Sequence, residues 1–296
     1  MKPDSTFAKQ DKDFWANVRL ISQHVGYTVR LPRRKRAPDE PKESGPIKVP
    51  TLAEIHAALD ELSLSSSHLI NPRTAKPTRE GKLLMAYYQH RANCLNDFVR
   101  PRLMDKDKAQ RTFEQLRKRL CPNCPLPMNK QKGPKKAPAF FTGIINMLIE
   151  SNAVGSPCDY DPRELTTFTR NRQPFRTLSR RVDGAFPGPV NPVAVWDIKE
   201  YYYTTTFGSR VADGVYESLL DGMELEELRG QGTDVKHYLM IDDYFTWWNC
   251  GRSYLCRIVD MLHMGYVDEA LFGAEVVDRL PQLVAEWVRI AKSATQ

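Results

Sequence analysis

Two short stretches decide the expected fold: Arg181-Val182-Asp183-Gly184 and, after a turn that carries Pro187-Gly188-Pro189, the run Val193-Ala194-Val195-Trp196-Asp197-Ile198-Lys199-Glu200. The second stretch is rich in β-branched and aromatic residues, which is typical of a strand. Side chains alternate between the faces of a strand, so Asp197 and Lys199 point one way while Trp196 and Ile198 point the other. Burying an Asp and a Lys in an apolar strand is costly unless they are paired or bind an ion.

The segments around this run predict an α/β domain. Strands are expected at Leu178–Phe186, Val193–Tyr203 and His237–Phe245, and helices at Phe140–Asn152, from Gly208-Ser209 onward, at Ser253–His263 and at Gly273–Ala291. Helix, hairpin, helix, strand and helix, in this order, indicate a mixed central sheet flanked by helices.

The first part of the chain is predicted to be helical. Helices are expected at Phe14–Val29, from Thr51 to Leu62 with Glu54 completing a capping box, and over Arg79–Leu120 with a break at Arg100-Pro101. Two stretches rich in proline and charge interrupt this pattern: Arg30–Pro50, expected to be an exposed linker, and Lys130–Pro138, expected to mark the domain boundary. We therefore predict a helical N-terminal domain at residues 1–130 and an α/β domain at residues 131–296.

The composition is that of an ordinary globular protein, with 41% hydrophobic and 27% charged residues among 296. Lys and Arg number 43 against 36 Asp and Glu, and this excess favours a polyanionic partner such as nucleic acid. Met1–Leu20 lacks an apolar signal segment, and no apolar run is long enough to cross a membrane, so a cytoplasmic protein with reduced cysteines is expected. Cys121 and Cys124 have the spacing of zinc ligands, with a plain proline-rich turn as the alternative.

The acidic residues and the lysine suggest a catalytic site. Asp183 ends the first predicted strand of the hairpin, and the connecting turn would return the chain so that Asp183 lies beside Asp197. Two carboxylates form an oxygen site suited to Mg²⁺, which lowers the pKa of a bound water. Lys199 would stabilise the negative charge that develops on a phosphate. The alternative is an edge strand with solvated Asp197 and Lys199, in which Asp183-Gly184 is simply a turn.

Asp183, followed after a turn by Asp197-Ile198-Lys199, resembles the PD-(D/E)xK signature of the restriction-endonuclease-like superfamily over roughly Phe140–Phe245. The resemblance implies a mixed sheet flanked by helices, with Asp183 and Asp197 as metal ligands and Lys199 as the catalytic lysine. Val182 stands where the signature has a proline. Many members also carry a catalytic Glu on the preceding helix. Glu150 is the candidate for that position, and an ordinary solvated glutamate is the alternative.

Arginines near the motif are predicted to contact DNA phosphates, with a solvated surface as the alternative; they are Arg172, Arg176, Arg180, Arg181 and Arg252. We therefore expect a magnesium-dependent type II restriction endonuclease that cuts double-stranded DNA. A palindromic target would call for a homodimer. The N-terminal helices are expected to read the DNA and to contribute to dimerisation. The alternatives are a phage-defence or repair nuclease of the same chemistry, a DNA-binding regulator without catalysis, and a structural protein without a metal.

Overall fold

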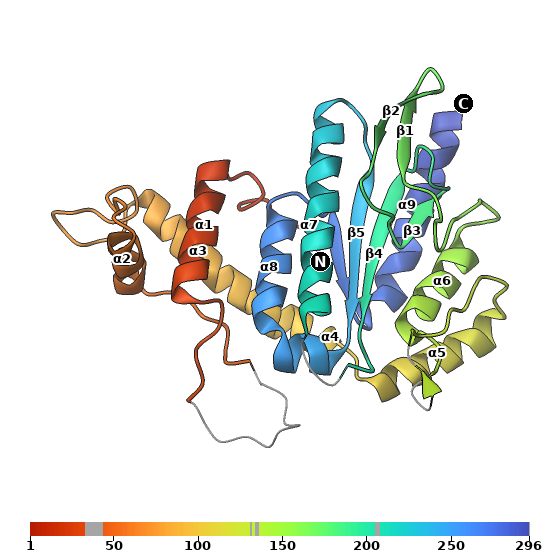
Figure 1. The fold of residues 1–296 in the computed structure, drawn as a ribbon, viewed down its shortest axis with the longest axis horizontal. Coiled ribbons are helices and arrows are strands. Elements are labelled where there is room, and N and C mark those ends of the chain that lie inside the picture. The colour runs from red at the N-terminus through yellow and green to blue at the C-terminus, as the bar shows by residue number, and fades with distance from the viewer. Residues whose placement is uncertain (33–43, 131, 134–135, 205–207, 296) are drawn as a thin grey trace.

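A four-stranded sheet forms the centre of the computed structural model, which describes residues 1–32, 44–130, 132–133, 136–204 and 208–295 (Figure 1). The strand order is β3 (Gly184–Phe186), β4 (Ala194–Glu200), β5 (Lys236–Asp242) and β6 (Glu269–Phe272). Strand β3 runs antiparallel to β4, whereas β4, β5 and β6 are parallel to one another. The sheet is therefore mixed, and the expected α/β class is confirmed.

Helices cover both faces of this sheet, because the connections between parallel strands return the chain over a face. Helices α6 (Phe140–Asn152) and α9 (Glu275–Thr295) pack on one face, where Trp287 stacks on Trp196 with ring centroids 5.4 Å apart. Helices α7 (Ser209–Gly230) and α8 (Arg252–His263) link the parallel strands and pack on the other face (Figure 1). In the part of the chain that the structure describes, no helix is long and apolar enough to cross a membrane.

The N-terminal helices form a cluster beside α8. Helices α1 (Lys12–Val25), α2 (Leu52–Glu61) and α3 (Arg79–Asn93) bury a common apolar core. Helix α2 begins with the predicted capping box, because the Thr51 side chain accepts a hydrogen bond from Glu54 N while the Glu54 carboxylate accepts one from Thr51 N.

The helical stretch predicted from Arg79 to Leu120 is divided in the structure. After α3 come the π-helical segment η1 (Cys94–Val99), the short α4 (Arg100–Arg102) and then α5 (Lys106–Leu120). Helix α5 packs against α6, with the Phe113 and Phe140 rings 5.6 Å apart, and it shares the core of α6 and α9. The structure thus groups α5 with the sheet, although this helix precedes the boundary predicted at residues 130 and 131.

The observed strands differ in extent from the predicted ones. The strand expected at Leu178–Phe186 is reduced to β3, because Ser179 and Arg180 lie in a bend and donate side-chain hydrogen bonds to α7. The strand expected at His237–Phe245 is β5, which ends at Asp242 and is followed by the π-helical segment η3 (Tyr244–Cys250).

Two further parts of the sheet structure were not predicted. A hairpin of β1 (Thr167–Arg170) and β2 (Gln173–Thr177) forms within the arginine-rich segment, and β6 follows α8. Residues 33–43 of the predicted linker, and residues 131 and 134–135 of the second basic stretch, lie outside the described residues.

Candidate metal-binding and catalytic site

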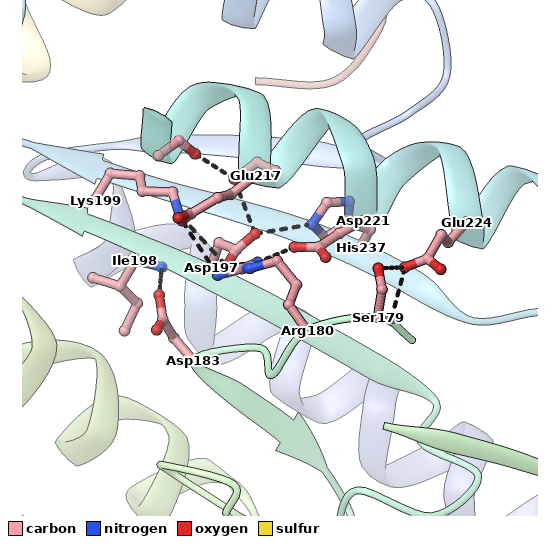
Figure 2. A network of polar contacts seen from close by, with 12 residues as sticks. Ser179, Arg180, Asp183, Asp197, Ile198, Lys199, Glu217, Asp221, Glu224 and His237 are labelled. Atoms are coloured by element: carbon pink, nitrogen blue, oxygen red, sulfur yellow. Dashed lines mark hydrogen bonds and ion pairs between the residues drawn. The ribbon is translucent and has the colours of Figure 1, made fainter. Parts of the chain in front are cut away.

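The centre of the candidate site is strand β4, whose side chains alternate as the sequence predicts. Trp196 faces α9, whereas Asp197 and Lys199 lie on the side of the sheet that α7 covers (Figure 2). Lys199 Nζ lies 3.6 Å from Asp197 Oδ1, and both side chains are buried. The Asp and the Lys therefore form a charge pair inside the protein, so this face of the sheet is not the solvated edge strand considered as the alternative.

Asp183 lies directly before β3 and is attached to β4 by two hydrogen bonds. Its backbone N–H donates to Trp196 O at 3.0 Å, and its Oδ2 accepts from Ile198 N at 2.7 Å. The Asp183 carboxylate is therefore held at the backbone between Asp197 and Lys199 (Figure 2). Burial and the negative charge of Asp197 raise the pKa of Asp183. The structure thus brings the three residues of the predicted motif into one electrostatic group.

Arg180 turns into this group from the bend before β3. Its Nη1 donates to Asp197 Oδ1 at 3.2 Å and also to Asp221 Oδ2, and its Nη2 lies 3.5 Å from Glu217 Oε2. Burial alone would lower the pKa of Arg180, but the charges of Asp197 and Asp221 outweigh it and hold the pKa above its usual value. Arg180, predicted from the sequence as a DNA contact, is thus bound to the carboxylates of the site.

The site also contains two buried residues that were not predicted from the sequence, Asp221 of α7 and His237 of β5. Their ligand atoms and one oxygen of Asp197 all lie within 4.8 Å of one another. His237 Nδ1 lies 2.9 Å from Tyr266 O, and His237 Nε2 lies 3.6 Å from Asp197 Oδ2, beyond hydrogen-bond distance. Among the described residues, this is the group of three with the spacing of metal ligands.

A sequence signal for Asp221 exists on the buried stripe of α7. Positions 211, 215, 218, 225 and 228 of this helix are buried, and Asp221 follows Ser218 by one helical turn. An aspartate on such a stripe is costly to bury unless it is paired or bound to an ion. His237 lacks a comparable local signal, because its place in the site depends on the pairing of β5 with β4.

The carboxylates of the site differ in their affinity for protons. Burial would raise the pKa of Asp197, but the positive charges of Lys199 and Arg180 and the neighbouring His237 together outweigh burial and hold that pKa well below the usual value. Burial and the charge of Asp197 raise the pKa of Asp221 to about 8. Burial would lower the pKa of Lys199, but Asp197 and Asp183 raise it above its usual value. Negative charge is therefore concentrated on Asp197, between two cations.

The structure places the other predicted residues away from this group. Glu150 lies near the end of α6, where its carboxylate accepts a hydrogen bond from Asn123 N at 3.0 Å. Among the described residues, no hydrogen bond or ion pair joins Glu150 to Asp183, Asp197 or Lys199. Cys121 is exposed and Cys124 is buried, and within the described residues neither belongs to a group with the spacing of metal ligands.

The predicted DNA-contacting arginines divide into two sets. Arg176 is paired with Glu224 and Glu227, and Arg252 donates to Trp248 O and Gly45 O. Arg172 and Arg181 are exposed, and the described residues hold no ion pair with either of them. The sequence-predicted phosphate contacts thus remain available at Arg172 and Arg181.

Comparison with known proteins assigns the chain to a family rather than to an activity. A family model described as a domain of unknown function, DUF7687, matches residues 104–287, and a second one, DUF7690, matches residues 1–98. No curated protein and no solved structure matches the chain. The two matched ranges meet between residues 98 and 104, before α5, in agreement with the packing of α5 on the sheet. The first match covers more than half of the chain and contains the whole candidate site, so the chain belongs to the DUF7687 family.

Proposed function

We propose that this protein is a magnesium-dependent endonuclease that hydrolyses phosphodiester bonds of double-stranded DNA, with the activity of a type II restriction enzyme. The observation that carries the proposal is the convergence of Asp183, directly before β3, with Asp197 and Lys199 of β4. Two carboxylates and a lysine, held by adjacent strands beside a helix-covered face, match the motif that the sequence resembles.

The donor atoms of Asp183 and Asp197 fit Mg²⁺, which prefers carboxylate oxygens. Burial and repulsion from the negative charge of Asp197 raise the pKa of Asp183. A divalent cation held by both would relieve this repulsion. When bound, Mg²⁺ would supply a water of lowered pKa and positive charge near the scissile phosphate.

The residues of the chain suggest how a phosphate would be held. Lys199 carries a fixed positive charge beside Asp197 and would donate a hydrogen bond to a phosphate oxygen. Arg180 is 23% exposed, so its guanidinium reaches from the carboxylates toward the surface. Arg172 and Arg181, both exposed, would contact the DNA backbone further out. Helices α1, α2 and α3 would read the target sequence, and a homodimer would cut both strands.

The test is incubation of the full chain with plasmid and phage DNA in Mg²⁺, with EDTA as the control. We expect discrete fragments that disappear in EDTA. Lys199→Met removes the charge and keeps the apolar stem, and we expect it to lower the cleavage rate by about 100-fold or more, as the loss of one preorganised donor does. Lys236→Met is the matched control, because Lys236 begins the neighbouring strand and pairs with Asp234 instead.

The possible outcomes separate the proposal from its rivals. Smeared products would indicate a nuclease without sequence specificity. Salt-sensitive DNA binding without any cleavage would overturn the proposal and favour a DNA-binding regulator. Equal cleavage rates for Lys199→Met and the wild type would remove Lys199 from the catalytic group.

A further inference from the structure

The two oxygens of the Asp197 carboxylate have different surroundings. Oδ1 lies near both protein cations, with Arg180 Nη1 at 3.2 Å and Lys199 Nζ at 3.6 Å. Oδ2 accepts a hydrogen bond from Ser218 Oγ at 2.9 Å and lies 3.6 Å from His237 Nε2. The protein's own cations therefore contact one oxygen, whereas the other faces a hydroxyl and an imidazole nitrogen.

Two ligand atoms of the site are buried without a hydrogen-bond partner among the described residues, namely Asp221 Oδ1 and His237 Nε2. Both residues are 0% exposed. Leaving a buried polar atom without a partner destabilises a folded protein. His237 Nδ1 lies 2.9 Å from Tyr266 O and donates to it, so Nε2 is the ring nitrogen that can offer a lone pair to a metal ion. A backbone carbonyl at the far nitrogen is the arrangement that orients a histidine for metal binding.

We propose that Asp197, Asp221 and His237 bind one first-row transition-metal ion, such as Mn²⁺. Their ligand atoms lie within 4.8 Å of one another, so a single ion can contact all three after small side-chain adjustments. Ser218 can release Asp197 Oδ2, because its hydroxyl lies 3.2 Å from a second acceptor, Gly214 O. This site shares Asp197 with the proposed magnesium pair, but Asp221 and His237 belong to the new site alone.

The chemistry of the ligands selects the class of metal. Mg²⁺ binds oxygen ligands and retains several waters, whereas an imidazole nitrogen suits transition metals. A site with two carboxylates and one histidine therefore favours Mn²⁺ over Mg²⁺. The inference does not rest on DNA hydrolysis, because occupancy of the site is measured on the protein alone.

The experiment is a titration of the full chain with Mn²⁺, in which the loss of the free-ion electron paramagnetic resonance signal measures binding. We expect the wild type to bind Mn²⁺ at this site and to retain it against an excess of Mg²⁺. We expect His237→Gln to weaken Mn²⁺ binding by at least about 10-fold and to reduce the preference over Mg²⁺. His263→Gln is the matched control, since His263 is also buried with its Nδ1 on a backbone carbonyl, Val259 O at 2.8 Å.

A second pair of variants tests the carboxylate ligand. Asp221→Asn should also weaken Mn²⁺ binding, whereas Asp213→Asn, at an exposed position of the same helix, should not. Circular dichroism establishes that each variant is folded, and Mn²⁺ should raise the Tm of the wild type more than that of Asp221→Asn.

Three results would overturn the inference: no Mn²⁺ binding by the wild type, equal wild-type affinities for Mn²⁺ and Mg²⁺, or unchanged Mn²⁺ affinity in folded His237→Gln. The result is separable from the proposed hydrolysis. A wild type that binds Mn²⁺ with the expected preference but never cuts DNA contradicts the endonuclease alone. DNA cleavage in Mg²⁺ without selective Mn²⁺ binding contradicts the transition-metal site alone.

Discussion

Glu200, the last residue of β4, has a carboxylate whose ionisation should affect stability. Its Oε2 accepts hydrogen bonds from Thr142 N at 3.0 Å and Thr142 Oγ1 at 2.9 Å, at the start of α6. Burial raises the pKa of Glu200 to about 7, although these hydrogen bonds oppose the shift. A carboxyl group with a raised pKa binds its proton more tightly in the folded state. The contribution of the protonated Glu200 carboxyl to the free energy of unfolding is therefore complete below the pKa that Glu200 has in the unfolded chain. It is lost as the pH rises through about 7.

Glu200→Gln removes this ionisation and keeps an oxygen that can accept from Thr142. We expect the Tm of the variant, relative to the wild type, to be higher at pH 8 than at pH 5, because each unit of pKa shift corresponds to about 1.4 kcal/mol. Thermal unfolding across this range measures the difference. Glu226→Gln, at an exposed position of α7, is the control. A Tm difference that does not change with pH would contradict the expected role of Glu200.

At the scale of secondary-structure elements, the β3–β4 pair depends on a close approach between Gly184 and Trp196. The two residues are opposite each other in the antiparallel ladder. A Cβ atom on Gly184 would lie 2.1 Å from the Trp196 indole, and Trp196 is fixed on its other side by stacking on Trp287. The absence of a side chain at Gly184 thus allows β3 to pair with β4 next to Asp183.

Gly184→Ala should therefore destabilise the protein by about 1–3 kcal/mol, the usual cost of overpacking a core. Chemical denaturation measures this loss of free energy of unfolding. Gly188→Ala is the matched control in the turn that follows β3, because a Cβ atom there would meet nothing within 4 Å. If both variants unfold at the same denaturant concentration as the wild type, the close packing at Gly184 does not limit stability.

At the scale of the whole molecule, a buried polar cluster links the N-terminal helices to the sheet. Arg91 of α3 lies 3.0 Å from Asp260 Oδ2 of α8, and Tyr87 of α3 donates a hydrogen bond to Asp260 Oδ1 at 2.5 Å. The Arg91 side chain is 0% exposed, and that of Asp260 is 6% exposed. Arg91 lies in the range matched by DUF7690 and Asp260 in the range matched by DUF7687, so a buried ion pair joins the two parts of the chain. This contact favours unfolding of both parts together.

Asp260→Ala leaves the charge of Arg91 buried without its carboxylate. We expect this variant to lose about 3–5 kcal/mol of stability, as is typical when one partner of a buried ion pair is removed. Chemical denaturation followed by tryptophan fluorescence and by circular dichroism measures the loss and the cooperativity of unfolding. Asp213→Ala, at an exposed position on α7, should change stability little. A wild type that unfolds in two separate transitions would contradict the coupling of the two parts.

The sequence alone determined the local features of the fold and the core of the site. The alternation of apolar and charged residues predicted both strand β4 and the common face of Asp197 and Lys199, because the period of a strand is a local property. The capping box at Thr51 predicted the start of α2, since its hydrogen bonds join residues three positions apart. Helix α6 was predicted with the observed bounds from its apolar run.

The tertiary structure decided which distant side chains complete the site. His237 enters because the parallel register places it opposite Val195, which shares the face of Asp197, and Asp221 enters because α7 turns that side chain toward the sheet. Arg180 bends inward because carboxylates from β4 and α7 are both there to receive it. These contacts join residues far apart in the chain. The pairing of β5 with β4 fixes His237, and no local pattern of residues encodes that pairing. The buried stripe of α7 indicates that Asp221 faces the interior, but not which side chains it meets there.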